Sequence, residues 1–149
     1  MRHTKITVFF ALVAVSAFLL ALSFTPLARG KGLVTDPRGS GSVTAKFIGM
    51  GGMIFQPGQN VDIRWTLQGD GVKYFETHPW GECELYFSPD GGQTWTRITP
   101  QLSVTRRDYQ WTVPNVVTRQ GVIALQIGIE GDGDFYLFTS DPFMVLGRR

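Results

Sequence analysis

The chain has 149 residues, with 14 lysines and arginines, 12 aspartates and glutamates, and a formal net charge of +2. This length suits one globular domain and excludes an array of domains. Three basic residues and no acid lie before position 31, whereas 11 basic and 12 acidic residues follow. The body of the chain is therefore nearly neutral, which argues against a nucleic-acid partner.

The first 30 residues have the pattern of an export signal. Arg2 and Lys5 precede an apolar run over residues 6–24, and Pro26 follows it. Small residues after the proline suit cleavage, so we expect a secretory signal peptide over residues 1–30. At about 1.5 Å per residue, the apolar run could also span a membrane as an uncleaved anchor. In both cases we expect an exported domain, whether secreted, periplasmic or membrane-anchored, that contacts a membrane only through an uncleaved N-terminus.

A stretch rich in glycine, serine and proline over residues 31–42 predicts a linker between the signal and the domain. Apolar and polar residues then alternate repeatedly over residues 43–149, which predicts β-strands. The expected strands cover residues 43–48, 61–67, 82–88, 108–113, 122–129, 135–138 and 143–145. No part of this region has helical periodicity, so we expect no helix in it. About seven short strands between glycine turns predict an all-β, antiparallel β-sandwich.

The single cysteine, Cys83, excludes an internal disulfide. It lies at the same strand parity as Leu85 and Phe87, so we expect it to be a small buried hydrophobic residue. A disulfide to a second chain is the alternative. His78 is the only histidine after residue 30, so the domain lacks the residues for a metal site with several histidines, and a Ser-His-Asp triad is not expected.

Four motifs follow one another along the domain. They are residues 57–65 (PGQNVDIRW), 85–92 (LYFSPDGG), 109–114 (YQWTVP) and 140–143 (SDPF). In this order they resemble the immunoglobulin-like or fibronectin type III-like domains of secreted surface proteins. The segment is similar in particular to the domain at the start of Ser/Thr-rich, GPI-anchored wall proteins. The resemblance implies an immunoglobulin-like sandwich, a surface location and no catalysis.

The segment SPDGGQTW over residues 88–95 fits the pattern S-x-D-x-G-x-T-W at every defined position. The positions are Ser88, Asp90, Gly92, Thr94 and Trp95. We expect Asp90 to accept backbone N–H groups, the two glycines to supply positive φ, and Trp95 to pack the hairpin on its sheet. The segment is similar to the Asp-box of sialidase propeller blades, in which the box is a fold element away from the active site. One box predicts a structural role, and sugar chemistry would be an analogy only.

Two glutamates could indicate a catalytic site instead of a binding module. Glu82 and Glu84 share a strand face roughly 6–7 Å apart, which is compatible with a glycosidase pair. We favour instead an outward, solvated face near Arg64. These glutamates and the acids of residues 130–134 are the groups that a small glycan hydrolase would use.

Three acids alternate in a predicted turn between two apolar strands. They are Glu130, Asp132 and Asp134. Calcium is the metal that such clustered oxygen ligands would suit. A polar hairpin without a metal is the favoured interpretation, and we expect no other cofactor.

The connection over residues 68–81 is the best candidate for a binding site. Its 14 residues exceed what a hairpin needs, and they include Tyr74, Phe75, His78 and Trp80. Exposed aromatic side chains in a loop stack on glycans or anchor a protein partner. The alternative is a loop folded back over the sandwich edge, with Tyr74 and Phe75 in the core.

Together these features predict a noncatalytic exported module that binds a surface glycan or an envelope protein through residues 68–81. A small carboxylate-based glycan hydrolase is the first alternative. A structural subunit of an envelope assembly is the second.

Overall fold

The computed structural model describes residues 34–35, 41–131 and 135–147 of the chain. The predicted export signal over residues 1–30 lies outside these residues and stays a prediction. Within the described part of the chain, no helix combines the length and the apolar character needed to cross a bilayer.

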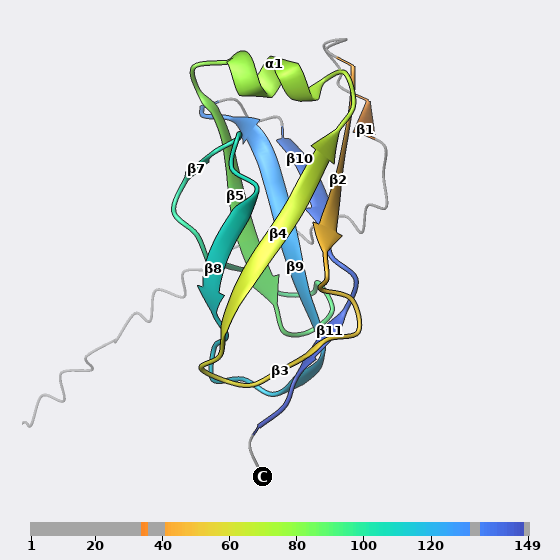
Figure 1. Ribbon diagram of the computed structural model, residues 1–149, viewed down its shortest axis with the longest axis vertical. Helices are drawn as coiled ribbons and strands as arrows, with labels where there is room; N and C mark the ends of the chain where they lie inside the picture. The colour runs from red at the N-terminus through yellow and green to blue at the C-terminus, as the bar shows by residue number, and fades with distance from the viewer. Residues whose placement is uncertain (1–33, 36–40, 132–134, 148–149) are drawn as a thin grey trace, which may run out of the picture.

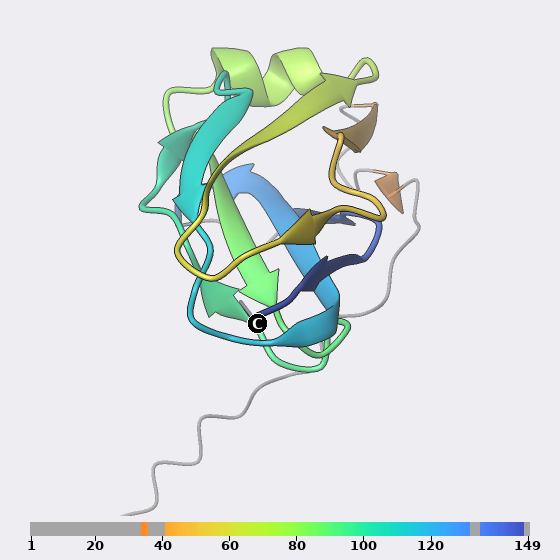
Figure 2. The same cartoon turned by 60° about the horizontal axis from the view of Figure 1, so that its bottom comes forward.

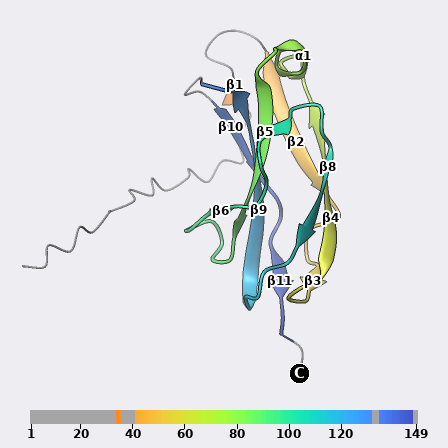
Figure 3. The same ribbon diagram turned by 90° about the vertical axis from the view of Figure 1, so that its left-hand side faces the viewer.

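Two β-sheets lie against each other as two layers, with β5 and β9 in one and β4 and β8 in the other (Figure 3). The first sheet has the order β1-β2-β4-β8. Its strands are β1 (Val34–Thr35), β2 (Ser42–Ile48), β4 (Asn60–Gln68) and β8 (Asp108–Thr112). All pairs in this sheet are antiparallel.

The second sheet has the order β3-β11-β9-β5-β6, with β10 also paired to β9 and β7 also paired to β5. Its strands are β3 (Ile54–Phe55), β11 (Phe143–Val145), β9 (Thr118–Ile129), β5 (Gly81–Ser88), β6 (Thr96–Arg97), β10 (Phe135–Thr139) and β7 (Leu102–Ser103). The pair β3 and β11 is parallel, and Figure 2 shows these two strands side by side at one end of the molecule. The predicted all-β class is confirmed by these sheets.

One helix interrupts the strands, and the prediction that the domain contains no helix was wrong. Helix α1 (Val72–Thr77) has six residues, begins after Gly71 without a side-chain cap, and lies across one end of the two sheets (Figure 1). Fewer than two turns leave no periodic apolar stripe in the sequence, and such a short helix depends on tertiary packing.

Four short strands were also missed. β1 lies in the predicted linker and pairs with the start of β2, whereas β3, β6 and β7 lie in segments for which no strand was expected. Each has two residues, so none of them can show period-two alternation. Ser42, expected at the end of the linker, is the first residue of β2.

The predicted inward faces of the main strands form one core between the sheets. The most completely buried residues of this core are Val43, Ile63, Trp65, Cys83, Leu85, Val113, Ile123, Leu125, Ile127, Phe143 and Val145. The run over residues 135–138 is apolar at every position, yet only Tyr136 and Phe138 are buried and Phe135 is exposed. The alternation therefore predicted the core correctly, but it left open which apolar residues face solvent.

Strands β10 and β11 pair with successive parts of β9, so they form one long strand that is interrupted over residues 140–142. At this interruption, Ser140 forms two hydrogen bonds with Ile123 of β9. Its N–H donates to the carbonyl oxygen of Ile123 at 2.8 Å, and its Oγ accepts the Ile123 N–H at 3.0 Å. The predicted closing motif thus lies at a break between two strands that share one partner.

Candidate functional site

The connection over residues 68–81 folds around one buried aromatic ring. Phe75 of α1 is buried, and its ring contacts those of Tyr136 and Tyr74 with centroids 5.5 and 5.3 Å apart. A Cβ at Gly81 would lie 2.0 Å from the Phe75 carbonyl oxygen, so only glycine allows β5 to begin this close to the helix. The helix is therefore fixed to the core at one point and to β5 at another.

Hydrogen bonds fix the backbone between α1 and β5. The His78 N–H donates to the carbonyl oxygens of Tyr74 and Phe75, at 3.1 and 3.3 Å. The Trp80 N–H donates to Nδ1 of His78 at 3.2 Å, and the Trp80 carbonyl oxygen accepts the Glu130 N–H at 2.9 Å. The Trp80 side chain is nevertheless 61% exposed, so a rigid turn presents an aromatic ring to solvent.

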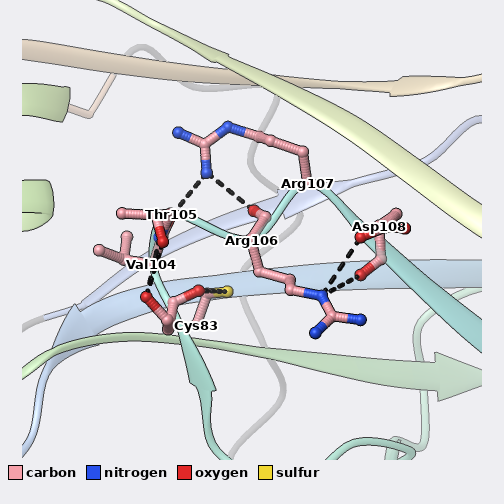
Figure 4. A network of polar contacts seen from close by, with 7 residues as sticks. Cys83, Val104, Thr105, Arg106, Arg107 and Asp108 are labelled. Carbon is pink, nitrogen blue, oxygen red and sulfur yellow. Dashed lines mark hydrogen bonds and ion pairs between the residues drawn. The ribbon is translucent and has the colours of Figure 1, made fainter.

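An ion pair ties the helix to the turn between β7 and β8. The Arg107 guanidinium pairs with the Glu76 carboxylate and also donates to the carbonyl oxygens of Val104 and Arg106, at 2.5 and 2.8 Å. Figure 4 shows these two backbone contacts together with the Arg106 to Asp108 ion pair of 3.2 Å. The helix is thus supported from a second loop as well as from the core.

Strand register places two further side chains on one face of the sheet at the end where Trp80 lies. On β9, Gly128 is paired with Glu82 on one side and with Phe135 on the other. Directly opposed residues lie on the same face of a sheet, so Glu82 and Phe135 share a face. The next residues along these strands are buried in the core: Cys83, Ile127 and Tyr136. The shared face is therefore the outer one, and Phe135 is 48% exposed on it.

We name the group formed by Trp80, Glu82, Glu130 and Phe135 the Trp80 corner. Sequence reasoning placed Trp80 in the candidate site but left Phe135 out of it. The sequence contained a sign of this. Residues 135–138 are all apolar, and in a two-layer sandwich one face of each strand points away from the core, so some of these side chains had to be exposed. That Phe135 lies on the same sheet face as Glu82 depends on the order β5-β9-β10, which the sequence does not reveal.

The other predicted site residues divide between core and surface. Phe75 is core, as the alternative of a folded-back loop required, whereas Tyr74 lies at the surface with its ring 5.9 Å from that of His78. His78 is half-buried and accepts the Trp80 N–H, so it positions the turn. The loop therefore both caps one end of the molecule and presents Tyr74 and Trp80.

The predicted surroundings of the glutamate pair were wrong. Arg64 lies on β4 in the opposite sheet, and the partner of Glu84 is Arg97, with Nη2 to Oε1 at 2.6 Å. The second carboxylate oxygen of Glu84 accepts the Tyr86 hydroxyl at 2.5 Å, and the Glu84 side chain is only 12% exposed. Burial and this hydrogen bond raise the pKa of Tyr86 to about 12. Both oxygens of Glu84 are therefore occupied by structural contacts.

Asp90 organises the turn at the other end of β5. Its Oδ1 accepts the Ser88 hydroxyl at 2.7 Å and the N–H groups of Gln93 and Thr94 at 3.0 and 2.8 Å, while its Oδ2 accepts the Thr94 hydroxyl at 2.6 Å. Burial opposes ionisation of Asp90, but these hydrogen bonds outweigh it and lower its pKa to about 2. The carboxylate is the centre of the turn.

The rest of this turn matches the geometry expected of it. Gly91 and Gly92 have φ values of 72° and 95°, and the Trp95 Nε1 donates to the Gly92 carbonyl oxygen at 3.1 Å. The Gly91 N–H donates to the carbonyl oxygen of Gln120 on β9 at 3.0 Å. All these polar groups are used within the fold, which leaves the turn a structural role.

Cys83 is buried, as predicted. Its Sγ lies 3.4 Å from the carbonyl oxygen of Ser103, and Figure 4 shows this contact. Burial raises the pKa of the thiol to about 11, so little thiolate forms at neutral pH. A disulfide to a second chain would require the strand to open.

The calcium hypothesis rests mainly on residues outside the described part of the chain. Glu130 is exposed after β9, but Asp132 and Asp134 are among the residues that the structure leaves undescribed. In the described ranges, no group of three or more histidines, cysteines or acids is placed to hold a metal. Calcium binding by this turn stays a prediction.

A groove of about 540 Å³ opens between the edge strands β6 and β8. Apolar and aromatic side chains form most of its wall, and none of its lining residues is charged. They are Phe87, Pro89, Thr96, Ile98, Tyr109, Gln110, Trp111, Thr112, Pro114 and Val116. The sequence could not indicate this groove, because it depends on which strands form the sheet edges.

No protein-family model matches the chain, and the curated proteins searched include no match to it.

Proposed function

We propose that the chain is a noncatalytic, exported binding module that engages a glycan or a protein of the cell surface or envelope at the Trp80 corner. The observation that carries this proposal is the Trp80 side chain, which is 61% exposed on a turn whose backbone is fixed from both sides. A preorganised aromatic side chain loses little entropy on binding, and tryptophan is enriched among the residues that dominate interface energies.

The strand order supports an immunoglobulin-like sandwich. The four strands β4, β5, β8 and β9 alternate between the two sheets, with β4 and β8 in one and β5 and β9 in the other. Near the start of the domain, β2 pairs with β4 in the first sheet, and β3, which follows it, lies in the second sheet parallel to β11. Domains of this architecture present their loops at the two ends of the sandwich, and α1, which precedes the turn with Trp80, lies at one of these ends.

The contacts of Glu84 favour binding over hydrolysis. A retaining or inverting glycosidase needs two carboxylates free to exchange protons or attack the sugar. Glu84 is instead held by Arg97 and Tyr86. The hydrolase alternative predicts a pH-dependent activity that Glu84→Gln abolishes, and we expect no turnover on glycan panels.

The test compares Trp80→Ala with wild type on a glycan array and in pull-downs from the native envelope. Val117→Ala is the matched control, because Val117 is exposed and lies outside the Trp80 corner, between β8 and β9. We expect Trp80→Ala to lose at least tenfold in binding, as for a dominant interface residue, and the control to bind like wild type. Unchanged binding by Trp80→Ala would overturn the proposal and would favour a structural subunit that assembles through another surface.

A further inference from the structure

The Trp80 corner exposes two large aromatic side chains on one outer surface. Trp80 precedes β5 and Phe135 begins β10, and the end of β9 lies between them. Glu82 and Phe135 are two strand spacings apart, roughly 10 Å between their Cα atoms. A soluble domain usually buries such rings, so their joint exposure indicates a contact surface.

Among the described residues, no cation forms an ion pair with the carboxylates at this surface. In the described ranges, neither Glu82 nor Glu130 forms an ion pair, and the nearby Arg97 is held by Glu84. Glu82 lies on the same outer face as Phe135, and Glu130 is joined to Trp80 through its N–H group. Two carboxylates that form no ion pair with a described residue therefore border the aromatic surface.

The electrostatic surroundings of Glu82 agree with this description. Burial raises its pKa, a hydrogen bond with Gln101 opposes that rise, and the negative charges of Glu84 and Glu130 raise it further. Arg97 lowers it by a smaller amount. The local field thus remains negative despite the neighbouring arginine, and it would stabilise an incoming cation.

We propose that the Trp80 corner binds a protein segment that presents an arginine or lysine side chain. This inference rests on the proposed binding function and specifies its partner. Arginine matches both features of the surface with one side chain, because its planar guanidinium stacks on aromatic rings and also pairs with carboxylates. A neutral ligand could donate hydrogen bonds to Glu82 and Glu130, but only a cationic ligand would also gain from their charge.

The test uses an array of immobilised random peptides probed with the purified chain, beside a glycan array. Glu82→Gln/Glu130→Gln removes both charges with little change in shape. Asp62→Asn is the matched control, since Asp62 is exposed on β4 in the opposite sheet. Circular dichroism of each variant confirms that it is folded.

We expect the peptides bound by wild type to be enriched in arginine and lysine, and bound more weakly as salt rises from about 50 to about 300 mM. The double variant should lose this enrichment and weaken basic peptides by about fivefold, as expected for two partly exposed ion pairs. The Asp62→Asn control should behave like wild type.

Other outcomes separate this inference from the proposed function. Peptide binding that requires Trp80 but shows no preference for basic residues, or that survives the double variant unchanged, would overturn the cationic partner alone. Glycan binding that requires Trp80, without peptide binding, would also overturn it and leave the binding function intact. Loss of neither ligand class in Trp80→Ala would overturn both.

Discussion

The two ends of β5 are built from different chemistry. At its start, Phe75 anchors a helix and the Trp80 side chain projects into solvent. At its end, Asp90 gathers the polar groups of the following turn, and Gly91 joins that turn to β9. One strand therefore carries an aromatic connection at one end and a closed polar turn at the other.

The difference separates stability from recognition. A turn whose carboxylate accepts four hydrogen bonds has few groups left for a ligand. The backbone of the Trp80 corner is also hydrogen-bonded, but the rings of Trp80 and Phe135 are exposed, and Glu82 and Glu130 form no ion pair among the described residues. We therefore assign recognition to the start of β5, where exposed side chains project from a fixed backbone. We assign a structural role to its end, where the polar groups bond to one another.

The largest expected effect comes from removing the anchor of the aromatic end. Phe75→Ala should lower the free energy of unfolding by about 3.5 kcal/mol, because it leaves a cavity beneath α1 and beside Tyr136. It should also weaken binding, since Trp80 follows the helix. Urea unfolding and array binding measure the two effects. Ile54→Ala, at an exposed position, should change stability by less than about 0.5 kcal/mol. A similar small change for Phe75→Ala would show that α1 is not anchored as described.

The second largest effect is expected for Asp90→Ala, which should change stability but not binding. Asp90→Ala removes the acceptor of four hydrogen bonds and should cost about 2.5 kcal/mol in urea unfolding. Binding under native conditions should stay within about twofold of wild type. Asp62→Ala is the control for loss of an exposed carboxylate. Loss of binding in a folded Asp90→Ala protein would contradict the division between the two ends of β5.

Asp90 also predicts how stability changes with pH. Its pKa in the folded chain is about 2, below the ordinary value of 3.8, so its contribution is fully present above about pH 4 and is lost as the pH falls toward 2. The gap in unfolding free energy between wild type and Asp90→Asn should therefore narrow over this range. Urea midpoints at about pH 6, 4 and 2.5 measure it, and a gap that does not change with pH would show that the carboxylate is not stabilised by the fold.

The core was predictable because it follows from alternation. Every second residue of the main strands is apolar, and this pattern identified the inward positions of β4, β5 and β9, among them Ile63, Leu85 and Leu125. The turn at Asp90 was also predictable, because residues 88–95 contain the groups that bond to its carboxylate. Both features depend on residues close together in the sequence.

The site was only partly predictable because it depends on sheet order. Trp80 was identified as an exposed aromatic, but Phe135 lies 55 positions later and is brought to the same end of the sheet only through the pairing of β10 with β9. The ion pair of Glu84 with Arg97 also follows from cross-strand neighbours. Helix α1 is too short to show a period, so the rigid support beneath Trp80 was not foreseen.

Trp80→Ala should have the smallest effect on stability, and it gives the most direct test of binding at the Trp80 corner. Trp80→Ala should alter the free energy of unfolding by less than about 0.5 kcal/mol, because the ring is mostly exposed and only its backbone is held. The decisive measurement is array binding by folded Trp80→Ala beside folded Asp90→Ala. We predict that the first loses at least tenfold in binding while the second binds like wild type. Wild-type binding by Trp80→Ala would contradict the assignment of recognition to the Trp80 corner.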